Sequence, residues 1–124
     1  MPVLIIYGIP RGISEKHIDL LQGTLKSAVT EINELAIDQS QVTCLLPLQH
    51  PEPREIFIPS SGWPQSKEII IFIDGLFDKP QRNAKVRSKL AESVGKAMKK
   101  FFPEALVEVF VRPFNPDQGF WAEK

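Results

Sequence analysis

The chain has 124 residues, of which 43% are hydrophobic and 24% are charged, proportions that are ordinary for a single globular domain. Fifteen basic and fifteen acidic side chains cancel at pH 7, so no overall field favours nucleic acid or a membrane surface as a partner. Cys44 is the only cysteine, which excludes an intramolecular disulfide and favours a reducing compartment.

The first segment predicts a strand followed by a long helix. Residues 3–7 are an apolar, largely β-branched run typical of a strand buried on both faces. Its length is too short for a signal peptide or a membrane span and no basic leader precedes it, so we expect a cytoplasmic protein. A turn at residues 10–12 leads to Ser14, the predicted N-cap. The helix stripe comprises Ile18, Leu21, Leu25, Val29, Ile32 and Leu35.

A proline-rich segment separates the two halves of the chain. Residues 42–48 predict a second strand, and Pro47 suggests its end or an edge position. Five of the eleven prolines lie within residues 47–64, where 55–58 could add a short strand. This segment is either functional, taking part in assembly or binding, or a stiffened surface connection.

The second half repeats the strand–helix–strand pattern. Residues 68–73 are the strongest strand signal, which ends at Asp74. Asp78 is the predicted N-cap of the next helix, with Pro80 in its first turn and Gln81 at capping-box spacing. The helix stripe comprises Leu90, Ala91, Val94, Ala97, Met98 and Phe101. Pro103 ends this helix, and residues 106–111 predict the last strand.

These elements predict one α+β or α/β domain over residues 1–124. Its parts are a first βαβ unit at about 2–48, a linker at about 49–66, a second unit at about 67–112 and a tail at 113–124. We expect one four-stranded sheet with both helices on one face. Two topologies stay open: a ferredoxin-like interleaved sheet, or units whose own strands are parallel neighbours. Strands that look buried on both faces require a cover for the second face, which an oligomer could supply.

Pro2 is the strongest candidate for chemistry. If Met1 is removed, the Pro2 nitrogen becomes a secondary amine, whereas a retained Met1 leaves an amide without base character. An apolar pocket or a nearby cation lowers the pKa of such an amine. A base poised near neutral pH can move a proton beside a carbonyl, most effectively when a cation holds the carboxylate or enolate.

Met-Pro before a hydrophobic strand, followed by Pro10-Arg11 ahead of a long helix, resembles the tautomerase superfamily. The fused members with two units per chain, such as macrophage migration inhibitory factor, are similar in length and layout, and we expect a bacterial branch. The resemblance implies a homotrimer with the sheets inside and the helices outside. It also implies a cofactor-independent tautomerase or isomerase for a small keto–enol carboxylic acid.

The same resemblance implies the site residues. Pro2 matches the general base, and Arg11 is the nearest match to the carboxylate-binding arginine. Arg112 and Arg54 are further candidate anion contacts, and Trp121 lies where the family often places a C-terminal aromatic near the pocket. Two departures are the missing lysine near residues 41–42 and the pair Glu108 and Phe110 in place of a tyrosine and an asparagine.

Two other functions stay open: a non-catalytic homo-oligomer with this fold, and a ferredoxin-like nucleic-acid-binding module. The second would use the basic second helix, although a solvated helix face explains that charge as well. His17 and His50 stand far apart in the sequence without acidic or cysteine neighbours at ligand spacing. We therefore expect no metal, no cofactor and no nucleic-acid partner.

Overall fold

The computed structural model describes residues 2–47 and 66–124. Arg54, the predicted short strand at 55–58 and nearly all of the linker lie outside the described residues. The main elements are β1 (Val3–Tyr7), α1 (Glu15–Thr30), β2 (Thr43–Leu45), β3 (Glu68–Phe77), α2 (Ala84–Phe101) and β4 (Leu106–Phe114). Short 3-10 turns cover Asn33–Leu35, Gln39–Gln41 and Pro116–Gln118. No helix within the described ranges is long and apolar enough to cross a membrane.

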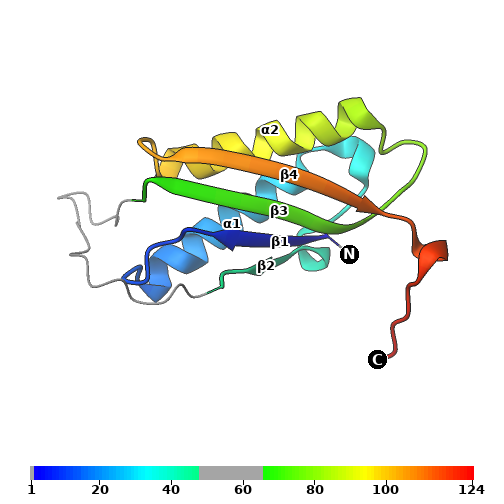
Figure 1. The fold of residues 1–124 in the computed structure, drawn as a ribbon, viewed down its shortest axis with the longest axis horizontal. Coiled ribbons are helices and arrows are strands. Elements are labelled where there is room, and N and C mark those ends of the chain that lie inside the picture. Colours follow the sequence, from blue (N-terminus) through cyan, green and yellow to red (C-terminus); the bar gives the residue numbers. More distant parts are fainter. Residues whose placement is uncertain (1, 48–65) are drawn as a thin grey trace.

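The four strands form one mixed sheet in the order β2-β1-β3-β4 (Figure 1). Each unit pairs its own two strands in parallel, β1 with β2 and β3 with β4. The units meet through the antiparallel pair β1–β3, in which Val3 is opposite Asp74 and Tyr7 is opposite Ile70. This strand order confirms the predicted topology in which the two strands of each unit are parallel neighbours. The interleaved ferredoxin-like alternative is wrong.

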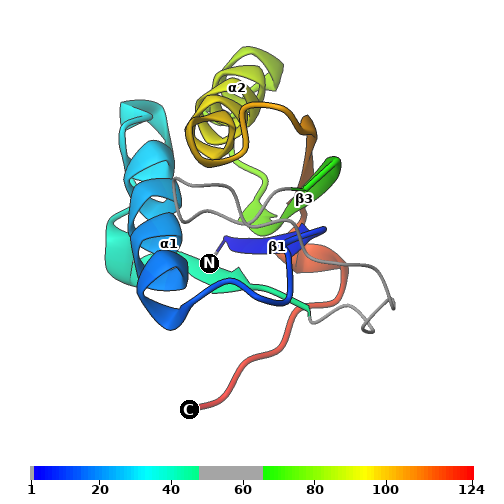
Figure 2. The ribbon, with the colours of Figure 1, turned by 90° about the vertical axis from the view of Figure 1, so that its left-hand side faces the viewer.

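Both helices cover the same face of the sheet (Figure 1, Figure 2). Leu4 and Ile6 of β1 are fully buried against that layer, and so are Ile69, Ile71 and Ile73 of β3. The alternate side chains face the other side and stay partly exposed, Tyr7 by 42%. The prediction of strands buried on both faces is therefore wrong for the single chain, because one face of the sheet is left open.

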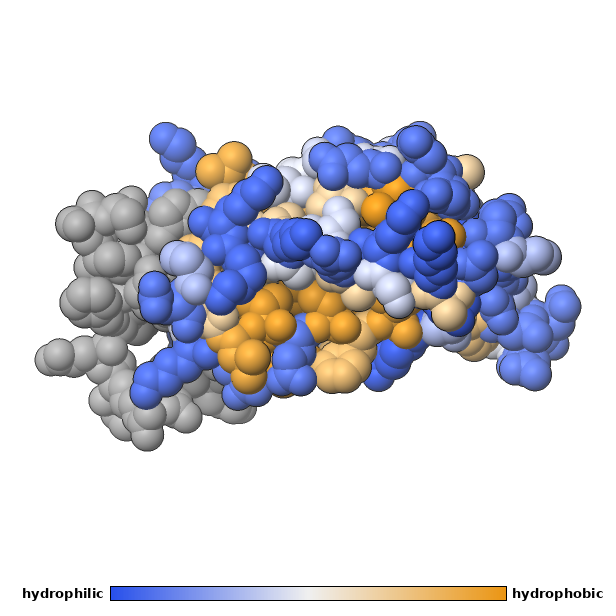
Figure 3. All heavy atoms as spheres, turned by 90° about the horizontal axis from the view of Figure 1, so that it is seen from above, coloured by the Kyte–Doolittle hydropathy of each residue, from blue (hydrophilic) through white to orange (hydrophobic). Residues whose placement is uncertain are grey.

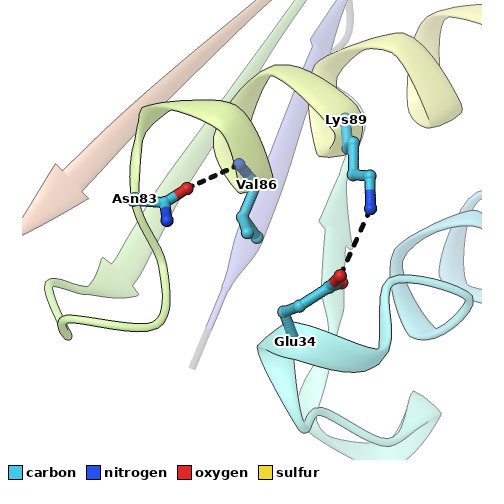
Figure 4. Close-up of polar contacts among 4 residues, drawn as sticks. All are labelled: Glu34, Asn83, Val86 and Lys89. Carbon is cyan, nitrogen blue, oxygen red and sulfur yellow. Dashed lines mark hydrogen bonds and ion pairs between the residues drawn. The ribbon is translucent and has the colours of Figure 1, made fainter.

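The start of α2 also differs from the prediction. The helix begins at Ala84, and the N-cap is Asn83, whose side chain accepts a hydrogen bond from the Val86 backbone N–H at 3.0 Å (Figure 4). Asp78 cannot cap it because β3 continues to Phe77, and the Asp78 N–H donates to the Phe114 carbonyl at the end of β4. Pairing with β4 thus moves the N-cap five residues along the chain, from Asp78 to Asn83.

The remaining boundaries shift less. Ser14 caps α1 as predicted, accepting a hydrogen bond from the His17 N–H, but the helix ends at Thr30 and the predicted stripe runs on into a 3-10 turn. β2 has only three residues at the sheet edge, and β4 extends beyond 111 to Phe114. β3 passes through Asp74 and Gly75 instead of ending there, because both residues oppose Arg112 alone in a bulge of the β3–β4 pair.

Gly8 joins β1 to the turn before α1 and tolerates no side chain. Its φ is +97°, and a Cβ there would collide with the Glu68 carbonyl oxygen. Its own carbonyl accepts a hydrogen bond from the Ser66 hydroxyl at 2.8 Å. We expect Gly8→Ala to lower the free energy of unfolding by at least about 2 kcal/mol in urea denaturation, because strain and collision add.

The matched control is Gly23→Ala on the exposed side of α1, where a Cβ would meet nothing within 4 Å. This change should raise the free energy of unfolding by about 0.5–1 kcal/mol, since glycine is the poorer helix former. Equal effects of the two substitutions would contradict the account of Gly8.

Candidate active site

Pro2 lies directly before β1 and is buried. Its carbonyl accepts a hydrogen bond from the Thr43 N–H at 3.1 Å, which ties the chain start to the edge strand β2. Because its neighbour Val3 is opposite Asp74, Pro2 lies at the end of the sheet where β3 and β4 finish (Figure 1). The nitrogen of Pro2 is therefore held at a defined place in the fold.

An ion pair occupies the same end of the sheet. The Arg112 Nε and Nη2 atoms donate to the two carboxylate oxygens of Asp74, each at 2.5 Å. The guanidinium also lies over the Phe72 ring, 4.2 Å from its centroid. The hydrogen bonds to Asp74 raise the pKa of Arg112 above its usual value. Sequence reasoning missed Asp74, because an Asp-Gly pair after an apolar run reads as the end of a strand.

Arg11 and Trp121 do not join Pro2 within one chain. Arg11 is exposed in the turn after β1, so the whole strand, about 15 Å at about 3.3 Å per residue, separates it from Pro2. Trp121 is 80% exposed in the tail, which leaves the sheet beyond β4 (Figure 1). The neighbouring Phe120 packs edge-on against Phe77, with ring centroids 5.0 Å apart. Among the described residues, the Asp74–Arg112 pair thus lies at the same end of the sheet as Pro2, whereas Arg11 does not.

The open face of the sheet carries apolar side chains along its length. Tyr7 packs edge-on against Phe72, and Phe72 stacks on Phe110 with centroids 5.4 Å apart. Phe110 and Leu106 are 46% and 60% exposed. Figure 3 shows hydrophobic side chains gathered beside the hydrophilic band of the helix side. A large apolar surface of this kind is typical of a contact with another protein surface.

Most of the basic side chains of α2 and of the turn before it make hydrogen bonds or ion pairs within the chain. Arg82 is 8% exposed and donates to the carbonyls of Leu35 and Phe77. The Lys89 Nζ lies 3.2 Å from a Glu34 carboxylate oxygen (Figure 4). Further contacts join Lys96 to Glu92, Arg87 to the Arg82 carbonyl, and Lys99 to the carbonyls of Pro103 and Ala105. The helix is thus less available to phosphate than its composition suggests.

Four hollows and the ligand-type side chains of the described residues were the other candidates for a site. Four hollows of about 310–380 Å³ lie along the helices and their flanking turns, and none of these four is lined by Pro2, Arg11 or Arg112. Within residues 2–47 and 66–124, no three His, Cys, Asp or Glu side chains gather in a group that could hold a metal ion. The expectation of a site without metal stays a prediction.

No protein-family model matches the sequence, and no curated protein matches it. Solved structures do match its fold. An asymmetric trimer of a fused 4-OT is 16% identical, with a TM-score of 0.67, over 98% of this chain and 94% of that chain. Pt0534 inactivated by 2-oxo-3-pentynoate is 14% identical, with a TM-score of 0.65, over 97% and 92%.

FG41 malonate semialdehyde decarboxylase inhibited by 3-bromopropiolate is 15% identical, with a TM-score of 0.61, over 98% of this chain and 91% of that chain. These structures belong to the tautomerase superfamily, so the chain has the tautomerase fold. The predicted resemblance is confirmed at the level of the fold.

Cys44 faces the helix layer from β2 and packs partly against the core. Burial raises the pKa of its thiol, against a smaller lowering by Lys26. A raised pKa means less thiolate at pH 8 than in the unfolded chain. We expect iodoacetamide to modify Cys44 at least about tenfold more slowly in the native than in the urea-unfolded protein. An equal or faster native rate, followed by mass spectrometry, would contradict this assignment.

Proposed function

We propose that the chain is a cofactor-independent tautomerase or isomerase for a small keto–enol carboxylic acid, with Pro2 as the general base. The observation that carries this proposal is the place of Pro2, which is buried at the end of a tautomerase-fold sheet where the Asp74–Arg112 pair also lies. The proposal requires removal of Met1, because only then is the Pro2 nitrogen an amine.

The chemistry is a proton transfer. The Pro2 nitrogen takes a proton from the carbon beside the substrate carbonyl, which leaves an enolate and a prolinium ion. The prolinium then returns the proton to a different carbon, so the base is regenerated and the net change is isomerisation. A cation that holds the substrate's carboxylate and the developing enolate lowers the barrier to both steps.

The substrate class is supported by two of the similar structures. Pt0534 is inactivated by 2-oxo-3-pentynoate, and FG41 malonate semialdehyde decarboxylase is inhibited by 3-bromopropiolate. Both compounds are small unsaturated acids. A site that takes a small acid needs an accessible cation, and Arg11 and Arg112 are the candidates in the described part of this chain.

We further propose that the protein assembles as a homotrimer through the open faces of its sheets. The apolar open face supports this, and so do the fused 4-OT structures, which are trimers. Assembly also offers the route by which Arg11 could reach a Pro2 site, namely the site of another copy, because the strand β1 separates the two residues within one chain. The trimer would then complete the site.

The second candidate function is a non-catalytic homo-oligomer. One observation favours it: the guanidinium of Arg112, at the Pro2 end of the sheet, is paired with a carboxylate of the same chain. The two functions differ in their dependence on Pro2, since a binding or scaffolding role does not need a free N-terminal amine.

Pro2→Ala decides between the two functions. In the Met1-free protein, we expect this change to lower the rate of ketonisation of a simple enol acid at least about 100-fold, because a general base contributes about 10²–10⁴. The N-terminal mass of each protein, measured by intact mass spectrometry, shows that Met1 is absent from both. Equal rates would refute catalysis by Pro2.

Phe110→Lys tests the trimer. We expect the wild type to run in native mass spectrometry at three times 14.0 kDa, and the variant to run as a monomer, because a charge replaces a half-exposed ring at the proposed interface. Leu20→Lys is the control, since Leu20 is 55% exposed on α1, outside that interface. A wild-type monomer, or a trimer that survives Phe110→Lys, would argue against assembly through this face.

A further inference from the structure

The bulge at Asp74 and Gly75 places a carboxylate against the arginine beside Pro2. We propose that Asp74 is a specificity-determining residue, which masks Arg112 so that a substrate carboxylate binds this cation only by displacing Asp74. The inference rests on the proposed function in one respect, namely that a small carboxylate approaches the Pro2 end of the sheet.

The order of the strands puts Asp74 between the base and the cation. Val3, next to Pro2, is opposite Asp74 on β3, and Asp74 pairs with Arg112 on β4. Neighbouring strands lie about 4.8 Å apart, so Arg112 starts two strand spacings from the β1 backbone, with the carboxylate in the strand between them. In the order of the strands, the carboxylate of Asp74 therefore lies between the strand of Pro2 and the strand of Arg112.

The bulge is what aligns this pair. On β3 two residues, Asp74 and Gly75, lie between Ile73 and Leu76, whereas on β4 only Arg112 lies between their partners Val111 and Pro113. A bulge re-aims the side chains beside it, and Gly75 supplies the positive φ of 73° in this turn of the strand. The backbone of the bulge thus sets the alignment of Asp74 with Arg112.

The guanidinium is held on two sides. Asp74 occupies its Nε and Nη2 donors, and the Phe72 ring covers one face. Bidentate carboxylate binding is the mode in which arginine holds acids most specifically, so Asp74 occupies the donor edge that a substrate carboxylate would use. The side chains of Arg112 and Asp74 are 54% and 29% exposed in the single chain. In the proposed trimer, the pair stays open to exchange with an incoming anion only where the contact between the sheets leaves this end of the open face uncovered.

The consequence is a selection among acids. A simple monocarboxylate gains little binding free energy at Arg112, because its carboxylate only replaces the carboxylate of Asp74. An acid with a second anchoring group, such as a 2-oxo oxygen or a further carboxylate, can gain enough to displace Asp74. The masked cation therefore favours functionalised acids over simple ones.

The test measures binding of 2-oxobutanoate to the assembled, Met1-free protein by calorimetry, with no need for turnover. We expect Asp74→Asn to lower the dissociation constant about tenfold, because the competing charge is gone while the side chain keeps its shape. In an Arg112→Met background the same change should bring no gain. Asp74→Ser should repeat the effect, which guards against a local disturbance of the bulge by one particular side chain.

Asp19→Asn is the matched control. Asp19 is an exposed carboxylate on α1, outside the open face of the sheet, and its removal should change the affinity less than twofold. An unchanged or weaker affinity in Asp74→Asn would overturn the proposal, and so would a gain that persists in Arg112→Met, or no binding by any variant. Because the readout is affinity, a loss of the Pro2 mechanism would leave this result standing.

Discussion

Five antiparallel residue pairs between β1 and β3 are the contact on which the rest of the structure depends. Each unit pairs its own two strands in parallel, and a unit of fewer than about 50 residues buries only a small fraction of its surface by itself. The β1–β3 pairs join the units into one sheet, beneath which both helices share a core of side chains such as Leu4, Leu25 and Leu90. We call these β1–β3 pairs the seam. Without the seam, each unit would have its own small core, and the chain would not form a single domain.

The same seam determines which charges lie near the chain start. Because β1 runs antiparallel to β3, Pro2 at the beginning of β1 meets the end of β3, where the bulge presents Asp74 to Arg112. The direction of β1 also carries Arg11 to the opposite end of the sheet. At the Pro2 end of the sheet, the chain's own arginine is therefore paired with a carboxylate, and under the proposed function a free cation would come from another copy.

Local signals were enough for much of this fold. The β-branched run at Val3–Tyr7 and the Ser14 cap depend on neighbours in sequence, and both are confirmed. The beginning of α2 depends on β4, which lies far along the chain and prolongs β3 past Asp74 to Phe77. Nor could the apolar runs reveal an open sheet face, because Ile5, Phe72 and Phe110 are as apolar on that face as their neighbours are on the buried one.

The candidate site likewise has one part that neighbours in the sequence indicate and another that depends on distant residues. The sequence singles out Pro2 by its place directly before a strand, whereas Asp74 becomes visible only when β3 and β4 are aligned with each other. The partners of the α2 cations are equally non-local, as the contact of Lys89 with Glu34 illustrates. A charged helix in the sequence is therefore a poor guide to a charged binding surface when the acceptors lie on other elements.

The most direct test is an NMR titration of the Pro2 nitrogen in Met1-free protein labelled with ¹⁵N-proline. The account predicts an amine signal that titrates with pH and shifts when 2-oxobutanoate is added, because the base and the acid share one site. An amine signal that titrates with pH but does not shift when 2-oxobutanoate is added would contradict the account.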